Sequence, residues 1–376
     1  ADATGPTKDE LTLSGKIEGS GGLTKVGAGK VVLGNGTSVY SGGTTVTGGT
    51  LETSVASALP APSVPPKSGD VSIGSSGVLD LQGNAQSIGT LSGEGRVDLW
   101  GGTLTVRDGN FTGQLVGTTA SSLTKTSSGI LILGNSKSLG NTLGSTTIEA
   151  GKLTAANAKA LGDGSVTIQD GGTLEIANVG LALGSSAKMT IDGGASSGGG
   201  GTLSGTGTQA RYAGGLELAI PSGNPTATRT NVRADTNEVL TLTGEITGGA
   251  GLYKIGDGEV VLSPSAKNPY TGGTVIEKGT LTVNKHGEAL NDGKVTVESG
   301  ATLNIDSVVL SLTQGLNLSG DGAGGVGALT GTGTAGYSGG ITLVSNASVG
   351  AADATGPTKD ELTLSGKIEG SGGLTK

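Results

Sequence analysis

The chain has 376 residues, of which 76 are Gly and only one each are Trp, Phe and Met, and its net charge is −8. The acidic balance and the lack of a basic patch argue against nucleic acids and anionic membranes as partners. The absence of Cys excludes a disulfide-stapled secreted domain. No apolar run approaches the roughly 18 residues of a membrane-spanning helix. No signal peptide is recognisable at Ala1, so the signal and anchor of an exported parent are expected outside this segment.

Short stretches of alternating apolar and polar residues recur along the chain, each bounded by Gly, Asn, Asp or Ser. Such alternation predicts half-buried strands, and it argues against the disorder that the Gly and Ser content alone would suggest. The predicted strands include residues 11–13, 104–106, 174–176, 281–283 and 303–305. Residues 156–161 could form one helical turn but not a helical layer, so the sequence predicts an all-β fold.

The chain begins and ends with the same segment. Ala1 to Lys25 reads ADATGPTKDELTLSGKIEGSGGLTK, and Ala352 to Lys376 repeats it without a mismatch, 351 residues later. We therefore interpret residues 1–351 as one full repeat period and residues 352–376 as the start of the next copy. A duplication that is not natural was the alternative interpretation.

A shorter repeat marks modules inside this period. Each copy begins with Leu-x-Lys and continues with spaced Gly and aliphatic residues. The marks are Leu23, Lys25, Gly27, Gly29, Tyr40 and Gly42 in the first copy, Leu252, Lys254, Gly256, Gly258, Tyr270 and Gly272 in the second, and Leu123 and Lys125 in a diverged copy that lacks the Tyr. They predict three unequal modules, at about 1–100, 101–229 and 230–351, in one continuous solenoid.

The pattern L-x-K-x-G-x-G-x-[VL]-x-L, followed by N, Y-x-G-G-T and G-x-L, resembles the autotransporter-associated β-strand repeat of bacterial surface proteins. The match is good over residues 23–51 and 252–281 and partial over 123–153. The resemblance implies an elongated, right-handed parallel β-helix (β-solenoid), export to the cell surface, and a part in passenger secretion and folding. It implies no catalytic activity.

A solenoid also accounts for the composition. Gly, Asn and Asp suit its tight corners, whereas Leu, Val and Ile fill a narrow interior in which bulky aromatic side chains are expected to fit poorly. Thr on the outer face is expected to stack with Thr one coil away. Lys25, Lys125 and Lys254 share the alternation phase of the preceding Leu. Since buried Lys is rare, we expect a corner to break the phase at each of them and to leave the side chain outside.

Motifs that could carry chemistry are few, and no catalytic, cofactor-binding or metal-binding residue is predicted. His286 is alone and lies in a turn-like stretch. Residues 194–198 match G-x-S-x-G, and residues 322–327 and 331–336 match G-x-G-x-x-G, but no helix is expected after any of them.

Two further sets of residues could form sites. Turn carboxylates that could pair or bind calcium when coils stack are Asp163, Asp257, Asp292 and Asp321. Trp100, Tyr212 and Tyr337 could form a sugar-binding platform, although isolated surface aromatic residues are the preferred interpretation.

The function predicted from sequence is a structural or adhesive repeat unit of an extracellular bacterial surface fibre, extended by end-to-end stacking. The expected partners are neighbouring copies of the repeat and, at the surface, glycans or other cells. Alternatives are a carbohydrate-active β-helix enzyme, a passenger with a single copy, and an ice-binding flat-faced solenoid, against which the unequal modules argue.

Overall fold

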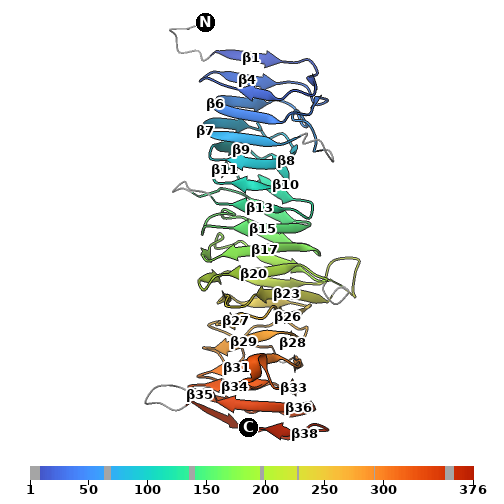
Figure 1. The fold of residues 1–376 in the computed structure, drawn as a ribbon, viewed down its shortest axis with the longest axis vertical. Helices are drawn as coiled ribbons and strands as arrows, with labels where there is room; N and C mark the ends of the chain where they lie inside the picture. The colour runs from blue at the N-terminus through green and yellow to red at the C-terminus, as the bar shows by residue number, and fades with distance from the viewer. Residues whose placement is uncertain are drawn as a thin grey trace. The chain divides into compact units, whose positions relative to one another are not determined.

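The computed structural model describes residues 9–62, 69–134, 140–194, 199–226, 228–291, 293–351 and 360–376. The chain divides into two compact units: Ala1–Thr167 with Ala182–Ala187, and Ile168–Leu181 with Lys188–Lys376. In each unit short strands follow one another around successive coils, and each strand pairs in parallel with its counterparts in neighbouring coils (Figure 1).

The first unit contains β1 to β15, and β16 spans the boundary in the sequence. Their bounds are β1 (Glu10–Leu13), β2 (Glu18–Gly19), β3 (Leu23–Lys25), β4 (Lys30–Leu33), β5 (Val39–Tyr40), β6 (Thr44–Thr53), β7 (Val71–Asp80), β8 (Gln86–Gly93), β9 (Arg96–Asp98), β10 (Thr103–Phe111), β11 (Gln114–Val116), β12 (Ser122–Lys125), β13 (Ile130–Leu133), β14 (Ser145–Ile148), β15 (Gly151–Ala155) and β16 (Ser165–Ile168).

The second unit contains β17 to β39 and one short 3-10 helix, η1. Their bounds are β17 (Gly172–Ala177), β18 (Gly180–Leu181), β19 (Met189–Asp192), β20 (Thr202–Thr206), β21 (Ala210–Tyr212), β22 (Leu216–Ala219), β23 (Arg229–Ala234), β24 (Val239–Leu242), β25 (Ile246–Gly248), β26 (Gly251–Ile255), β27 (Glu259–Leu262), β28 (Thr274–Ile276), β29 (Gly279–Asn284), β30 (Val295–Val297), β31 (Ala301–Asp306), β32 (Val309–Leu310), β33 (Leu316–Gly320), η1 (Ala323–Gly325), β34 (Leu329–Thr332), β35 (Thr334–Tyr337), β36 (Ile341–Ala351), β37 (Glu361–Leu364), β38 (Ile368–Gly370) and β39 (Leu374–Thr375).

The interior of each unit is a stack of aliphatic side chains contributed by successive coils. In the second unit one column joins β24, β27, β29, β31 and β34 in register, and its members Leu240, Val260, Leu281, Leu303 and Leu329 have no exposed surface. Burying each such side chain contributes about 1.5–3 kcal/mol. The alternation seen in the sequence therefore places one face of every strand in the core.

The predicted all-β fold and parallel β-solenoid are confirmed. The five strands predicted from alternation lie in β1, β10, β17, β29 and β31, and no α-helix occurs among the described residues. Residues 156–161 form turns instead of a helical turn. The expected Thr ladder on the outer face is present in the first unit, where Thr105, Thr124 and Thr147 are in register.

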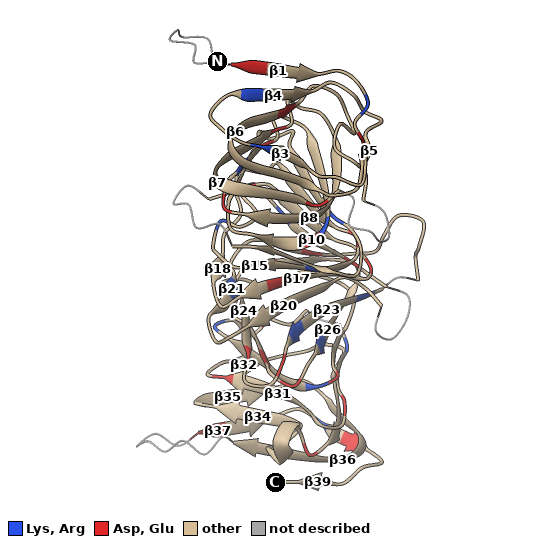
Figure 2. Ribbon diagram, turned by 45° about the horizontal axis from the view of Figure 1, so that its top comes forward, with Lys and Arg blue, Asp and Glu red and all other residues tan. Residues whose placement is uncertain are grey.

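The expectation that aromatic residues are excluded from the interior is wrong. Phe111 and four of the five Tyr residues are buried, each with at most 2% of its surface exposed. Charged residues of both signs are interspersed along the coils in Figure 2. The predicted module limits remain a prediction.

Candidate functional site

The Leu-x-Lys marks of the three modules place each Lys inside the solenoid. Lys254 is at the end of β26 and is fully buried. Its Nζ donates hydrogen bonds to the carbonyl oxygens of Ile255 at 3.1 Å and Gly256 at 2.7 Å, which belong to the turn that follows. A third bond, of 2.9 Å, reaches the carbonyl of Lys278 in the next coil. The ammonium group therefore joins the turns of two consecutive coils.

The other two modules repeat this arrangement, which we call the lysine turn. Lys25 is 5% exposed and Lys125 is fully buried. Lys25 Nζ donates to the carbonyls of Val26, Gly27 and Gly48 at 2.9, 2.7 and 2.9 Å, and Lys125 Nζ donates to those of Thr126, Ser127 and Ala150 at 2.5, 2.8 and 3.1 Å. In each case two acceptors lie in the Lys residue's own turn and one lies a coil further on.

A glycine of the next coil makes room for each lysine turn. Gly49, Gly151 and Gly279 have φ values of 65°, 66° and 63°, in the left-handed region that favours glycine. A Cβ at Gly279 would lie 2.4 Å from the carbonyl oxygen of Gly258 and 2.6 Å from that of Gly256. The G-x-L that ends the sequence motif is therefore the lid over the ammonium group.

The charge of the ammonium group is compatible with burial because its three N–H groups meet three acceptors. Burial lowers the pKa of Lys25, Lys125 and Lys254, in the last case to about 8. A pKa near 8 leaves most of Lys254 protonated at neutral pH. The protonated form is also the one with three donors, so it matches the three carbonyls.

These positions correct the expectation that a corner leaves each Lys outside. A corner does follow each Lys, but the side chain keeps the phase of the buried Leu two residues earlier. The reason is that the corner itself supplies carbonyl oxygens that point inward. A buried Lys usually needs a partner such as a carboxylate, and buried pairs of this kind are rare. Here the backbone carbonyls of a tight turn accept all three N–H bonds, so no second charged group is needed.

A family model matches the chain at two of the lysine turns. The passenger-associated-transport-repeat family matches residues 23–52 and 252–283, which contain two of the three lysine turns. The chain is 30% identical over 319 residues to the adhesin BmaC autotransporter of Brucella suis biovar 1. That alignment covers 83% of this chain but 8% of the adhesin. No solved structure matches the chain significantly.

Residues 23–52 and 252–283 are thus passenger-associated-transport repeats. The resemblance predicted from the motif is thereby confirmed, and a third, diverged lysine turn lies around Lys125. The segment spans less than a tenth of the length of the adhesin that it resembles. Any role of that whole protein is applied to this chain only as a proposal.

The remaining motif residues of the passenger repeats lie at two corners. Gly27, Gly29, Gly256 and Gly258 form the lysine turns. Gly42 and Gly272 form a second corner, where each approaches the preceding coil: a Cβ on Gly42 would lie 2.4 Å from the Gly22 nitrogen. Leu123 and Leu252 are fully buried, whereas Leu23 is half-buried.

Tyrosine anchors this second corner. The hydroxyl of Tyr40 bonds the Thr44 hydroxyl at 2.7 Å, and that of Tyr270 bonds Thr274 at 2.5 Å. Burial raises the pKa of Tyr40 and raises that of Tyr270 to about 12, so the phenols stay neutral at physiological pH.

Two further tyrosine corners were missed in the sequence. Tyr212 and Tyr337 are each about 99% buried, and their hydroxyls donate to the carbonyls of Gly215 and Gly340 at 3.1 Å. They cannot form a surface sugar platform, so both interpretations made for them from sequence are wrong. The signal was present, because Y-x-G-G occurs at all four corners. Trp100, the third residue of that set, is 56% exposed.

No catalytic constellation forms among the described residues. His286 lies in a turn and accepts a bond from the Glu288 amide at 3.1 Å. Asp163, Asp257 and Asp321 lie in turns, whereas Asp292 is outside the described residues. In the described part of the chain no group of three or more His, Cys, Asp or Glu residues could hold a metal ion.

The glycine-rich motifs do not form the predicted types of site in the described chain either. Residues 195–198 of the G-x-S-x-G match lie outside the described residues. Of the two G-x-G-x-x-G matches, residues 322–327 contain η1 and residues 331–336 join β34 to β35, without an α-helix after either in the described chain. None of the described helices is long and apolar enough to cross a membrane.

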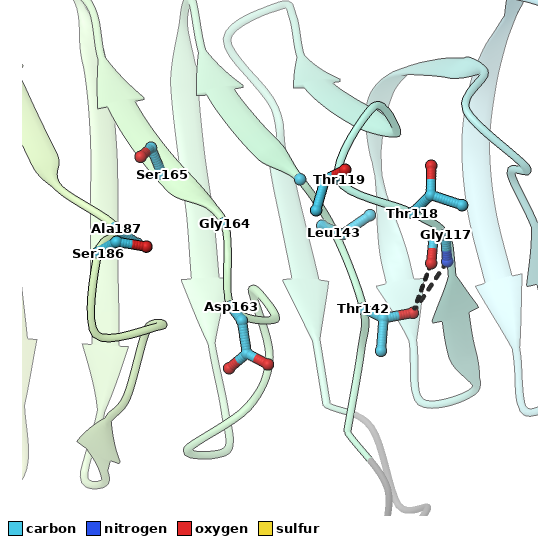
Figure 3. Close-up of a pocket in the computed structure, with 11 residues that line it drawn as sticks. Gly117, Thr118, Thr119, Thr142, Leu143, Asp163, Gly164, Ser165, Ser186 and Ala187 are labelled. Carbon is cyan, nitrogen blue, oxygen red and sulfur yellow. Dashed lines mark hydrogen bonds between the residues drawn. The ribbon is translucent and has the colours of Figure 1, made fainter.

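The first unit carries an open groove of about 420 Å³ on a row of turns. It is lined mainly by small polar residues from four successive turns, and Figure 3 shows their side chains. Thr142 fixes two of these turns together, because its hydroxyl accepts a bond from the Gly117 amide at 2.9 Å and donates to the Gly117 carbonyl at 3.3 Å. Asp163 supplies the one carboxylate of the lining and pairs with Lys159 at 2.6 Å.

Proposed function

We propose that this chain is one period of a tandem array that forms the stalk of a surface-exposed, adhesive bacterial protein of the autotransporter passenger type. The passenger repeats and the similarity to an autotransporter adhesin support an extracellular location and an adhesive or structural role. No catalytic step is proposed.

The observation that carries the array is the duplicated segment, whose two copies are paired on opposite edges. In the first copy, Glu10–Leu13 pairs with the coil that follows, so that Glu10 is opposite Lys30 and Leu11 opposite Val31. In the second copy, Glu361–Leu364 pairs with the coil that precedes, with Leu362 opposite Ala335. One sequence therefore accepts a coil on either edge.

Burial of equivalent residues agrees with this interpretation. Leu11 is 55% exposed, whereas its equivalent Leu362 is half-buried on the coil that precedes it. The strand edge that faces the following coil is also matched in charge, because Lys30 forms salt bridges with Glu10 at 2.8 Å and Glu52 at 3.1 Å. In an array the next copy of Lys30 would face Glu361, so opposite charges would meet across the junction.

The test is a chain of two consecutive periods with one cysteine pair at the junction. Leu362→Cys is combined with Cys at the second-period equivalent of Val31. Parallel neighbours in register lie close enough for a disulfide, so the pair is expected to close under mild oxidation. The pair Leu11→Cys and Val31→Cys in the single-period chain is the positive control.

A shifted pair provides the matched negative control. Moving the second cysteine to the equivalent of Val32 turns it to the opposite face of the strand. Closure of the shifted pair, or failure of the junction pair while the positive control closes, would refute continuous stacking. Mass spectrometry of non-reduced peptides identifies the bond.

A further inference from the structure

The only Trp of the chain lies on a turn whose conformation is unfavourable for it. Trp100, between β9 and β10, has φ of 49° and is 56% exposed. A bulky residue in the left-handed region is a conformational outlier, and an exposed indole gains little from packing. Packing in the core does not offset this backbone strain, because the side chain is exposed. The conformation therefore points to a contact of Trp100 outside the chain.

The turn of Trp100 is fixed directly onto the first turn of the groove. The Leu99 amide donates to the carbonyl of Val116 at 2.7 Å. Ser121, which is fully buried, accepts at its hydroxyl from the amides of both Gly101 and Thr118 at 2.9 Å. The turn that carries the indole therefore lies next to the first lining turn of the groove, one coil before it.

The lining of the groove is suited to a ligand with many hydroxyl groups. Thr118, Thr119, Ser165 and Ser186 contribute hydroxyls to the lining, and a hydroxyl group can both donate and accept. The hydroxyl of Thr142 is already bonded to the Gly117 backbone and holds the turns in place. Asp163 adds a carboxylate acceptor on the third turn. Figure 3 shows these groups on neighbouring turns, so they form a row along the stack of coils.

The spacing of the row selects the shape of the ligand. Successive coils are about 4.8 Å apart, which is close to the length of one pyranose unit in an extended chain. A volume of about 420 Å³ is in the range of small-molecule sites, although this groove is open along its length. Sugar rings present C–H faces that stack on indole and hydroxyl edges that bond Ser, Thr and Asp.

We propose that Trp100 and this groove bind a neutral, linear oligosaccharide, with one sugar ring stacked on the indole and the following units along the turns. A neutral chain is preferred because the net charge of −8 disfavours an anionic one, and the only carboxylate of the lining is already paired with Lys159. The site lies within the first unit, so it does not require the tandem array.

The single Trp makes the test direct. The full chain is titrated with cellopentaose, chitopentaose and mannopentaose, and the emission of Trp100 is recorded. We expect a saturable change of intensity with a blue shift for at least one of them, and none with oligogalacturonate. Absence of a saturable change with all three neutral sugars overturns the proposal.

Variants then separate the site from general effects. Trp100→Asn places a residue that tolerates positive φ on the turn, so we expect unchanged or higher thermal stability and a loss of affinity of roughly tenfold or more by calorimetry. Trp100→Phe should retain part of the affinity, and Thr118→Val should lower it several-fold. Val344→Asn, an exposed apolar position in the second unit, is the control.

Two outcomes of these measurements would contradict the site. Sugar binding that survives Trp100→Asn unchanged would exclude the indole, and a large loss of stability in that variant would assign Trp100 to the fold. Neither result would bear on the tandem array, because the test of the array by the junction disulfide does not involve Trp100. Failure of the array would likewise leave sugar binding by the single-period chain intact.

Discussion

Replacing Lys254 by Met tests the lysine turn most directly. Met retains the length and apolar stem of Lys but removes the ammonium group, so the carbonyls of Ile255, Gly256 and Lys278 lose their donor. Three hydrogen bonds to a charged group, at about 2 kcal/mol each, outweigh the cost of burying that charge. Burial of the charge offsets part of this gain, as the lowered pKa of about 8 indicates. We expect the free energy of unfolding to fall by about 3 kcal/mol.

The matched control is Lys278→Met, which removes the same charge from an exposed side chain of the neighbouring coil. Its effect should stay within about 0.5 kcal/mol. Urea unfolding followed by circular dichroism gives the overall change, and amide hydrogen exchange near residues 254–281 shows whether the two coils separate locally. Equal stability of the Lys254→Met and Lys278→Met variants would refute the role assigned to the ammonium group.

Two further predictions concern pH and the tyrosine corners. Because burial lowers the pKa of Lys254 to about 8 in the folded chain, while an unfolded Lys titrates near 10.4, the unfolded chain binds more protons between these values, and the free energy of unfolding should rise with pH in that window. Lys254→Met should flatten the rise in urea titrations at pH 7 to 10. Thr274→Val removes the hydroxyl that bonds Tyr270 and should cost about 1–2 kcal/mol. Thr146→Val should be neutral or stabilising, because the buried Thr146 hydroxyl has no hydrogen-bond partner among the described residues. A loss of stability in both Thr variants, measured by urea unfolding, would contradict this account.

The parallel stack was predictable because its physical requirements are local. Alternation over three to five residues fixes which face of a strand is buried, and Gly, Asn and Asp between the runs fix the corners. Repetition of Leu-x-Lys then shows that the same corner returns. These signals located β17, β29 and β31 well, since none of them depends on which distant coil lies next to them.

The lysine turn could not be predicted in the same way, because its acceptors belong to two coils. The acceptor from the neighbouring coil is a backbone carbonyl, and a carbonyl has no residue type by which a sequence pattern could reveal it. The rule that Lys avoids the core therefore gave the wrong side for Lys25, Lys125 and Lys254. The glycine of G-x-L was visible in the motif, but its role as a lid over the ammonium group required the structure.

Asparagine was assigned incorrectly for a related reason. The N of the sequence motif corresponds to Asn35 in the first copy and to Asn268 in the second, yet Asn35 is only half-buried. Asn268 is buried and bonds the Ile246 amide at 2.8 Å and the Ala289 carbonyl at 2.6 Å, in the coils on either side. Ser38 occupies the equivalent place in the first module, where its hydroxyl accepts from the Ile17 amide at 3.2 Å. Position relative to the Tyr, and not residue type, identifies this site.

The diverged copy around Lys125 shows which parts of the repeat the fold can lose. Leu143 stands where the others have Tyr, and the buried hydroxyl of Thr146, equivalent to Thr44 and Thr274, has no hydrogen-bond partner in the part of the chain that the structure describes. Ser127 adopts φ of 66° where the other modules have Gly, at a conformational cost. Lys125 nevertheless keeps all three carbonyl bonds. The stack thus tolerates the loss of a tyrosine corner and a strained turn. The bond through the ammonium group is retained, because it satisfies carbonyl oxygens of two consecutive coils at once.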